Sequence, residues 1–209
     1  PIKGILVVYD TVTETYKELP GADNPEYVQS NPTWSADGKW IVFARSKVYK
    51  KDSIANINSV LLNEKDVPEF IEDKEPYKYD LYRVPFNDGA GGIAEPLKGA
   101  SHNGMSNFFA KYSPDGKWIV FSVGVSLQMA KEAGERAQER EIFIARTDGS
   151  GLRRLTTSPG SDHGAVFSPD GKTITFASYR NGPSDIFAVD LDGSNERNLT
   201  RTSPVKPKH

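Results

Sequence analysis

The stretch YSPDGKWIVF, at residues 112–121, occurs three times in this chain with small changes. The other two copies are WSADGKWIVF at residues 34–43 and FSPDGKTITF at residues 167–176. Each copy contains a Ser-x-Asp-Gly turn, in which aspartate tolerates the third position and glycine takes the left-handed exit. The apolar run after the turn is typical of a short strand covered on both faces. Each copy therefore predicts a β-hairpin.

A second hairpin follows each copy. DIFAVDLDGSNERNLT, at residues 185–200, combines a strand, an Asp-Gly turn and a more polar outer strand. Similar stretches are REIFIARTDGSGLRRLT at 140–156, YDLYRVPFNDGAGGIAEPLK at 79–98 and, without a preceding decamer, GILVVYDTVTETYKELP at 4–20. The repeat unit thus has four strands, which we name a, b, c and d. Four short strands per repeat predict an all-β fold, a β-propeller of four-stranded antiparallel blades, with a β-sandwich as the alternative.

The repeats also predict how the chain is divided. The parts, within a single partial propeller over residues 1–209, are a half blade at 4–20 and three blades at 33–98, 108–157 and 164–202. The turn serines are 78 residues apart between Ser35 and Ser113 and 55 apart between Ser113 and Ser168, against about 40–45 for a plain blade. The excess predicts insertions between strands b and c at residues 46–79 and 126–141. The second insertion is expected to form a short helix.

These residues resemble the TolB-like (WD-repeat-like) β-propeller repeat family. Its blade pairs an S-P-D-G-K-x-I-x-F hairpin with a D-I-F/Y-x-x-D-x-D-G-x-x-x-R-x-L-T hairpin. Residues 164–202 match almost throughout, residues 108–157 and 33–98 match around their insertions, and residues 4–20 match loosely. The resemblance implies a ring of six blades, so three and a half blades are expected to be part of a larger propeller. Further sequence, another chain or a cleaved segment is expected to supply the missing blades.

Composition excludes several classes of function. The chain has 26 basic and 28 acidic residues, which gives no electrostatic case for binding nucleic acid. It has no run of 18 apolar residues, so no membrane insertion is expected. It has no cysteine, which excludes disulfides and thiolate chemistry. No signal peptide is visible and the first residue is Pro1, so a processed chain or a fragment is expected. A periplasmic or otherwise extracytoplasmic location is implied by the family resemblance only.

The two faces of a propeller differ in their connections. The b–c loops and the d–a links between blades emerge on one face, called here the b–c face, whereas the a–b and c–d turns emerge on the other, the turn face. Both insertions fall on the b–c face, and long loops on a rigid scaffold are where binding usually resides. Candidate interaction residues near the mouth of the central channel are Gln29, Asn31, His102, Asn103, Asn107, Asp162 and His163. Candidates in the insertions are Leu61, Leu62, Phe70, Gln128, Met129 and Arg136.

Other roles for these residues stay open. The polar residues of the links can cap local backbone or hold water, and the insertions can fold back on their own blades. His102, Asp162 and His163 lack the tight spacing of a metal site. GMSNF at residues 104–108 has only the first half of a nucleophile elbow. We therefore expect no catalytic residue, metal or cofactor in this chain.

The sequence thus predicts a non-catalytic extracytoplasmic scaffold that binds protein partners through the b–c face. The chain or segment that supplies the missing blades is expected to be among these partners. The alternative is an accessory propeller domain, or a fragment, of a larger periplasmic enzyme, peptidase-like or part of a multi-domain redox complex. Fold alone does not decide between them.

Overall fold

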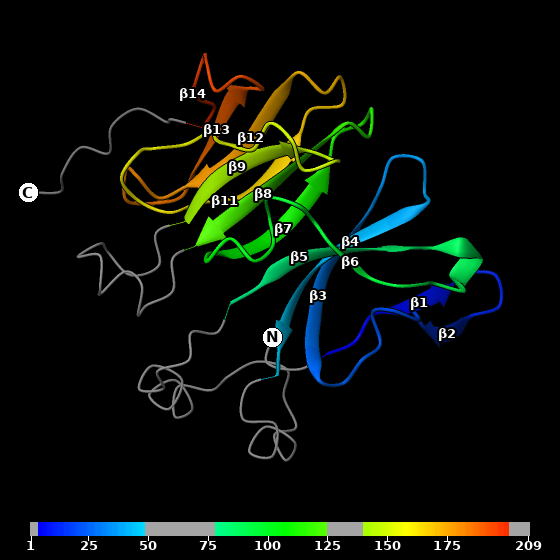
Figure 1. Cartoon of the computed structure of the whole chain (residues 1–209). Helices are drawn as coiled ribbons and strands as arrows, with labels where there is room; N and C mark the ends of the chain where they lie inside the picture. Colours follow the sequence, from blue (N-terminus) through cyan, green and yellow to red (C-terminus); the bar gives the residue numbers. More distant parts are fainter. Residues whose placement is uncertain (1–3, 49–77, 125–139, 201–209) are drawn as a thin grey trace, which may run out of the picture.

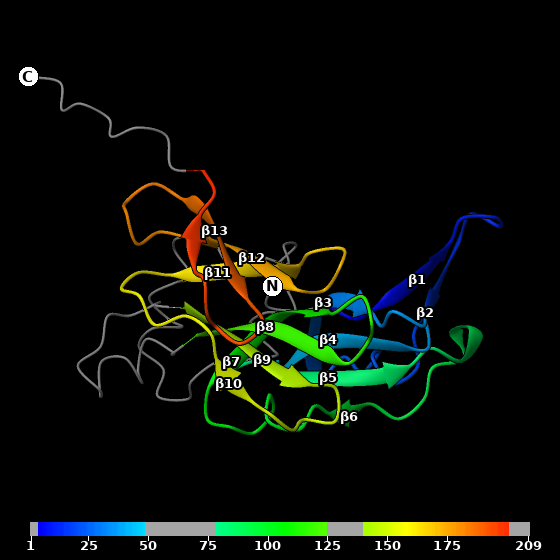
Figure 2. The same ribbon diagram turned by 90° about the horizontal axis from the view of Figure 1, so that it is seen from above.

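The computed structural model describes residues 4–48, 78–124 and 140–200 of the 209-residue chain. These residues form one two-stranded and three four-stranded antiparallel sheets, which lie side by side from the half blade (blue) to the last blade (orange) in Figures 1 and 2. Each sheet is a meander, because every strand pairs with its neighbour in the chain. The predicted all-β propeller architecture is confirmed, as a partial ring that does not close.

The strands follow the predicted order. The half blade contains β1 (Val7–Asp10) and β2 (Thr15–Glu18). Blade 1 contains β3 (Tyr27–Trp34), β4 (Trp40–Lys47), β5 (Asp80–Pro85), the 3-10 turn η1 (Asn87–Gly89) and β6 (Glu95–Pro96). Blade 2 contains β7 (Ser106–Tyr112), β8 (Trp118–Gly124), β9 (Arg140–Arg146) and β10 (Arg153–Arg154). Blade 3 contains β11 (Asp162–Phe167), β12 (Thr173–Ser178), β13 (Asp185–Asp190) and β14 (Arg197–Asn198).

The strand bounds correct several predicted limits. Strand a begins earlier than expected in every blade, at Tyr27 rather than residue 33 in blade 1, and two residues before the predicted start in blades 2 and 3. The first insertion starts later than expected, because β4 continues to Lys47. The second ends earlier, because β9 begins at Arg140. The helix expected in the second insertion falls mainly on residues 125–139, outside the described part of the chain.

The Ser-x-Asp-Gly turns use their side chains in the same way in all three blades. In blade 1, Ser35 Oγ donates to Asp37 Oδ1 at 2.6 Å and accepts from the backbone N–H of Trp40 at 2.9 Å. Asp37 Oδ1 also accepts from the backbone N–H of Lys39 at 3.1 Å. The same three bonds recur in blades 2 and 3. These bonds explain why Ser and Asp recur, and the turn forms in blade 1 although Ala36 replaces proline.

Strand b is buried on both faces where a blade has a neighbour on each side. In β4, Ile41 and Phe43 pack against the half blade, whereas Val42 and Ala44 pack against blade 2. Successive side chains of a strand point to opposite faces, so one continuous apolar run serves two interfaces. In β12 of blade 3, buried and partly buried residues alternate instead. Blade 3 therefore has one covered face and one open face among the described residues.

At the inner side of the arc, strand a of blade 2, β7, contacts strand a of blade 1, β3, and strand a of blade 3, β11. Lys111 on β7 donates from Nζ to Thr33 Oγ1 on β3 at 3.2 Å, which joins two neighbouring inner strands. Each inner strand also has a bulge at the same place, after Ser30, Phe108 and His163 respectively. A bulge bends a strand and turns the side chains before it relative to those after it. The candidate residues before the bulges therefore lie at the b–c ends of the inner strands.

Candidate functional site

Three candidate residues, Gln29, Asn107 and Asp162, occupy equivalent positions on the inner strands. Their relative exposures are 3%, 0% and 0%, so none presents its side chain freely at a channel mouth. Gln29 Nε2 donates to the carbonyl oxygens of Gly4 at 3.3 Å and Asn24 at 3.0 Å. Asn107 Nδ2 donates to Asn103 Oδ1 at 3.0 Å and to the Met105 carbonyl at 3.1 Å. Gln29 and Asn107 thus cap local backbone, one of the roles that the sequence left open.

The backbone of the same positions joins neighbouring blades. The Gln29 N–H donates to the Gly4 carbonyl at 2.9 Å, and the Asn107 N–H donates to the Tyr79 carbonyl at 2.7 Å. Gly4 and Tyr79 each precede a strand c of the previous blade. Asn103 closes the second link, because its Nδ2 donates to Asn107 Oδ1 at 3.1 Å and to the Gly99 carbonyl at 3.1 Å. These residues therefore hold the d–a links in place.

His102 belongs to an aromatic and charged cluster at the b–c end of blade 1. Its Nε2 lies 3.2 Å from the Tyr82 hydroxyl, and its Nδ1 lies 3.5 Å from Asp80 Oδ2. The Arg45 guanidinium lies 3.4 Å from the centroid of the Tyr82 ring and 4.5 Å from that of Tyr27. Of these residues, only His102 was predicted from the sequence as a candidate. The two cation–π contacts depend on how β3, β4 and β5 pair. The sequence alone did not predict the register of these strands at this end.

Blades 2 and 3 also carry aromatic side chains at this end. Arg140, the first residue of β9, lies 5.2 Å from the ring centroid of Phe108. In blade 3, His163 stacks on Tyr179 with the centroids 5.4 Å apart and the rings 11° from parallel. Tyr179 is 49% exposed. Burial and the nearby Arg140 lower the pKa of His163, against the opposing effect of Asp162, so the neutral imidazole is favoured.

Asp162 lies in a network of ion pairs beneath this surface. Its Oδ2 accepts from Arg180 Nη2 at 3.0 Å, and Arg180 also pairs with Glu196. The Arg180 guanidinium lies 4.3 Å from the ring centroid of Phe187. Burial raises the pKa of Asp162, and hydrogen bonding to Ser178 and the charge of Arg180 oppose that rise. The network holds Asp162 Oδ2, whereas the buried Oδ1 has no hydrogen-bond partner among the described residues.

The remaining candidates divide into two groups. Asn31 follows Ser30 at the first bulge, and its Oδ1 accepts from Ser30 Oγ at 3.0 Å. The insertion candidates Leu61, Leu62, Phe70, Gln128, Met129 and Arg136 lie outside the described residues.

Within residues 4–48, 78–124 and 140–200, no group of three His, Asp or Glu side chains is placed to hold a metal ion. No helix in this described part is long and apolar enough to cross a membrane.

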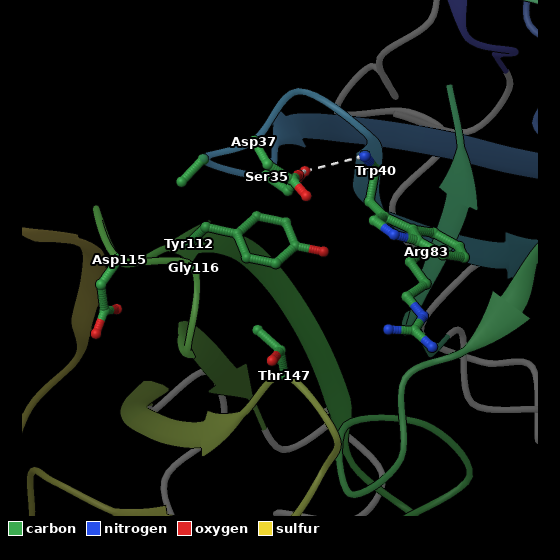
Figure 3. A pocket seen from close by; sticks show the side chains of 9 residues that line it. Ser35, Asp37, Trp40, Arg83, Tyr112, Asp115, Gly116 and Thr147 are labelled. Atoms are coloured by element: carbon green, nitrogen blue, oxygen red, sulfur yellow. Dashed lines mark hydrogen bonds between the residues drawn. The ribbon is translucent and has the colours of Figure 1, made fainter. Parts of the chain in front are cut away.

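A pocket on the turn face was not anticipated from the sequence. It has a volume of about 210 Å³ and lies between blades 1 and 2 (Figure 3). The a–b turns of both blades contribute to it, together with Trp40 and Arg83 of blade 1 and Tyr112 and Thr147 of blade 2. No motif marks this pocket, because its residues come from four segments that only blade packing brings together.

Comparison of sequences relates the chain to longer proteins. No protein-family model matches it. An uncharacterized protein of Agrobacterium fabrum is 26% identical over 192 residues, which cover 84% of this chain and 59% of that protein. The Tol-Pal system protein TolB of Bordetella pertussis is 44% identical over 54 residues, which cover 25% of this chain and 12% of that protein. The chain thus spans less than two thirds of these curated relatives.

Comparison of structures gives the same repeat fold. TolB from Acinetobacter baumannii has a TM-score of 0.60 at 22% identity, covering 94% of this chain and 37% of that chain. An oligogalacturonate lyase in complex with manganese has a TM-score of 0.60 at 18% identity, covering 94% and 47%. A puromycin-hydrolyzing peptidase of Mycobacterium tuberculosis has a TM-score of 0.63 at 15% identity, covering 95% and 27%. The TolB-like resemblance is confirmed at the level of the fold, which this chain shares with enzymes as well as with TolB.

Proposed function

We propose that this chain forms part of a non-catalytic β-propeller scaffold that binds a protein partner through its b–c face. The observation that supports this most directly is the recurrence of an arginine stacked on an aromatic ring at that face. Arg45 contacts Tyr82 and Tyr27 in blade 1, and Arg140 contacts Phe108 in blade 2. Arginine and aromatic residues are enriched at protein interfaces and at their energetic centres. Both insertions leave from this same face, which adds area for contact.

The partners in this proposal include the polypeptide that completes the ring. The open face of blade 3 exposes apolar residues, since Val166 is 43%, Ile186 39% and Leu199 52% exposed. In blades 1 and 2 the corresponding faces are covered by the next blade. The edge of β1 that a strand b would pair with is also open among the described residues. Every a–b hairpin in the described residues already belongs to a complete blade, so none of these hairpins is the completing segment of this proposal.

Location and class of partner follow from the resemblance and the charge. We propose a periplasmic or otherwise extracytoplasmic location on the TolB-like resemblance. The relative in Bordetella pertussis is a Tol-Pal system protein, which supports a role in an assembly of proteins. A nucleic-acid partner is not proposed, because the net charge of −2 gives no attraction to phosphates. Membrane insertion is not proposed either.

The second candidate function is an accessory propeller of a larger enzyme. The observation that supports this second function is the set of fold neighbours. An oligogalacturonate lyase and a puromycin-hydrolyzing peptidase align with almost the whole of this chain. This chain covers only 47% and 27% of those two chains. The mass and sequence of the native polypeptide distinguish the two functions. A catalytic domain joined to these blades would favour the second.

The test of the scaffold proposal is recovery of partners by the native protein from an extract of its own cells. Arg45→Ala with Arg140→Ala removes both stacked cations of the b–c face, and we expect recovery of the partner to fall at least about tenfold. The matched control is Arg146→Ala, because Arg146 stacks on Trp118 at 4.6 Å but lies at the turn-face end of β9. Equal recovery by the wild type and the double variant would contradict the proposed face. Equal losses in both variants would point to a general effect on folding.

A further inference from the structure

The turn-face pocket contains hydroxyl groups with no protein partner among the described residues. The Tyr112 hydroxyl points into the space between Asp37, Trp40 and Arg83 (Figure 3), and no residue in the described ranges bonds to it. The Thr147 hydroxyl, on the opposite wall of the pocket, likewise has no hydrogen-bond partner among the described residues. Neither oxygen is among the buried side-chain atoms that lack a partner, so both hydroxyls face solvent in the pocket and can bond water or a polar ligand.

The phenol stays neutral across the physiological range. Burial of the ring raises the pKa of Tyr112 to about 12, although the charge of Arg83 opposes this rise. A neutral phenol both donates and accepts a hydrogen bond. The Tyr112 side chain therefore offers a two-way polar group at the tip of an apolar ring.

The charges on either side of the phenol are opposite in sign. Asp37 Oδ1 accepts hydrogen bonds from Ser35 Oγ and from the Lys39 N–H. Asp37 Oδ2 takes no part in those two bonds. Arg83 bonds Glu95 through Nε at 3.3 Å and Nη2 at 3.0 Å, which leaves Nη1 outside those bonds. A charged ligand would be attracted by one of these groups and repelled by the other. The pair instead matches an uncharged ligand that both donates and accepts hydrogen bonds.

The aromatic residues of the pocket limit further which class of ligand it can bind. Trp40 and Tyr112 line the pocket, and its volume of about 210 Å³ suits one small ring rather than a chain. We propose that this pocket binds a single uncharged sugar residue. The Arg83 guanidinium lies 4.5 Å from the Trp40 ring centroid and covers one face of that ring. The C–H face of a pyranose packs on the remaining aromatic surface, and its hydroxyls bond Tyr112, Thr147, Asp37 and Arg83. A carboxamide is the weaker match, because it has no C–H face and only two polar groups for four partners.

This site is independent of the proposed protein-binding face. The pocket is built from the a–b turns and from the turn-face ends of β5 and β7, whereas Arg45 and Arg140 lie at the opposite ends of their strands. Sugar binding and partner binding are therefore expected to respond to different substitutions.

The test is saturation-transfer NMR on the full chain with methyl β-D-glucopyranoside, methyl β-D-galactopyranoside and N-acetylglucosamine. Glucuronate and glucosamine serve as charged comparators. We expect transfer to the C–H protons of at least one uncharged sugar, with weaker transfer to the charged ones. Tyr112→Phe keeps the ring and removes the hydroxyl, so the dissociation constant is expected to rise about 3- to 10-fold. Tyr179→Phe, on the b–c face, is the matched control and is expected to leave it unchanged.

Three results would overturn the proposal. The first is no transfer to any uncharged sugar at millimolar concentration, with the fold of the sample verified by near-ultraviolet circular dichroism. The second is equal binding by wild type, Tyr112→Phe and Asp37→Asn, which would place the sugar elsewhere on the surface. The third is displacement of the sugar by N-methylacetamide at equal concentration, which would assign the pocket to amides instead. Asp37→Asn keeps an oxygen acceptor for the turn, so loss of binding in that variant with an unchanged fold supports the site.

Discussion

At the scale of the residue, three equivalent positions show that the blades repeat the same backbone conformation. Asn31, Phe109 and Gly164 follow equivalent bulge residues of strand a and have φ values of 53°, 55° and 67°. Glycine adopts this region freely and asparagine tolerates it, whereas a bulky side chain is strained there. The same left-handed step is thus kept in all three blades, even where the sequence places phenylalanine. The architecture of the inner strand overrides the preference of the residue.

Gly164 gives a direct measure of this strain. Gly164→Ala is expected to lower the free energy of unfolding by about 1–2 kcal/mol, because alanine pays for the left-handed conformation. A Cβ added at this position meets nothing within 4 Å, so no clash contributes to the loss. Asn31→Gly keeps a residue that tolerates positive φ and is expected to change stability much less. Chemical denaturation measures both, and a Gly164→Ala variant as stable as the wild type would show that the bulge relaxes without cost.

The turn aspartates carry a pH dependence. Hydrogen bonds from the serine hydroxyl and from the lysine N–H lower the pKa of Asp37, Asp115 and Asp170 below the ordinary 3.8. A lowered pKa in the folded state means that the ionised form stabilises the fold above about 3.8, and that this contribution is lost as the pH falls through the folded pKa. Changing all three aspartates to asparagine is expected to flatten the fall in urea stability below about pH 4. Identical acid dependence in both proteins would contradict the assignment.

At the scale of the element, the middle of strand b distinguishes covered from uncovered blades. Val42, Val120 and Thr175 occupy the same place in the three decamers. Val120 is completely buried, whereas Thr175 is only partly buried on the open face of blade 3. Val120→Thr places a hydroxyl where water cannot reach it, and we expect a loss of about 1–3 kcal/mol. Thr175→Val is the matched reverse change and is expected to stay within about 0.5 kcal/mol. Thermal or urea unfolding that shows equal effects would mean that the two strands share one environment.

Elements differ in how far their sequence predicts them. The turn and strand b were predicted from the decamer, because Ser, Asp and Gly make local bonds and the apolar run has a clear length. The start of strand a in blade 1 was placed six residues late, because YVQSNPTW contains proline, a bulge and no apolar alternation. The Arg45–Tyr82 contact was missed, because Phe43, not Arg45, is the direct partner of Tyr82 across the two strands. Contacts that depend on side-chain reach or on blade packing, such as the turn-face pocket, leave no motif in the chain.

At the scale of the whole molecule, stability is expected to be highest in the middle of the arc. Blade 2 is covered by blade 1 on one side and by blade 3 on the other, whereas blade 3 and the half blade each have one face that no other described residue covers. In repeat architectures the stability of a unit grows with the number of its interfaces. The stability of the described blades is therefore expected to fall from blade 2 toward both ends of the arc. The two ends are the parts that a completing segment would stabilise.

Hydrogen exchange measured by mass spectrometry tests this gradient. The amides of β8 are expected to exchange about one to two orders of magnitude more slowly than those of β13, because opening the end blade breaks only one interface. Peptides from β1 and β2 are expected to exchange fastest, since all of β2 is exposed. If a segment that completes the ring is added, β12 and β13 gain an interface and their exchange is expected to slow, while β8 changes little. Equal protection of β8 and β13 in the isolated chain would mean that the blades open as one cooperative unit, and the open face of blade 3 would then carry no measurable cost.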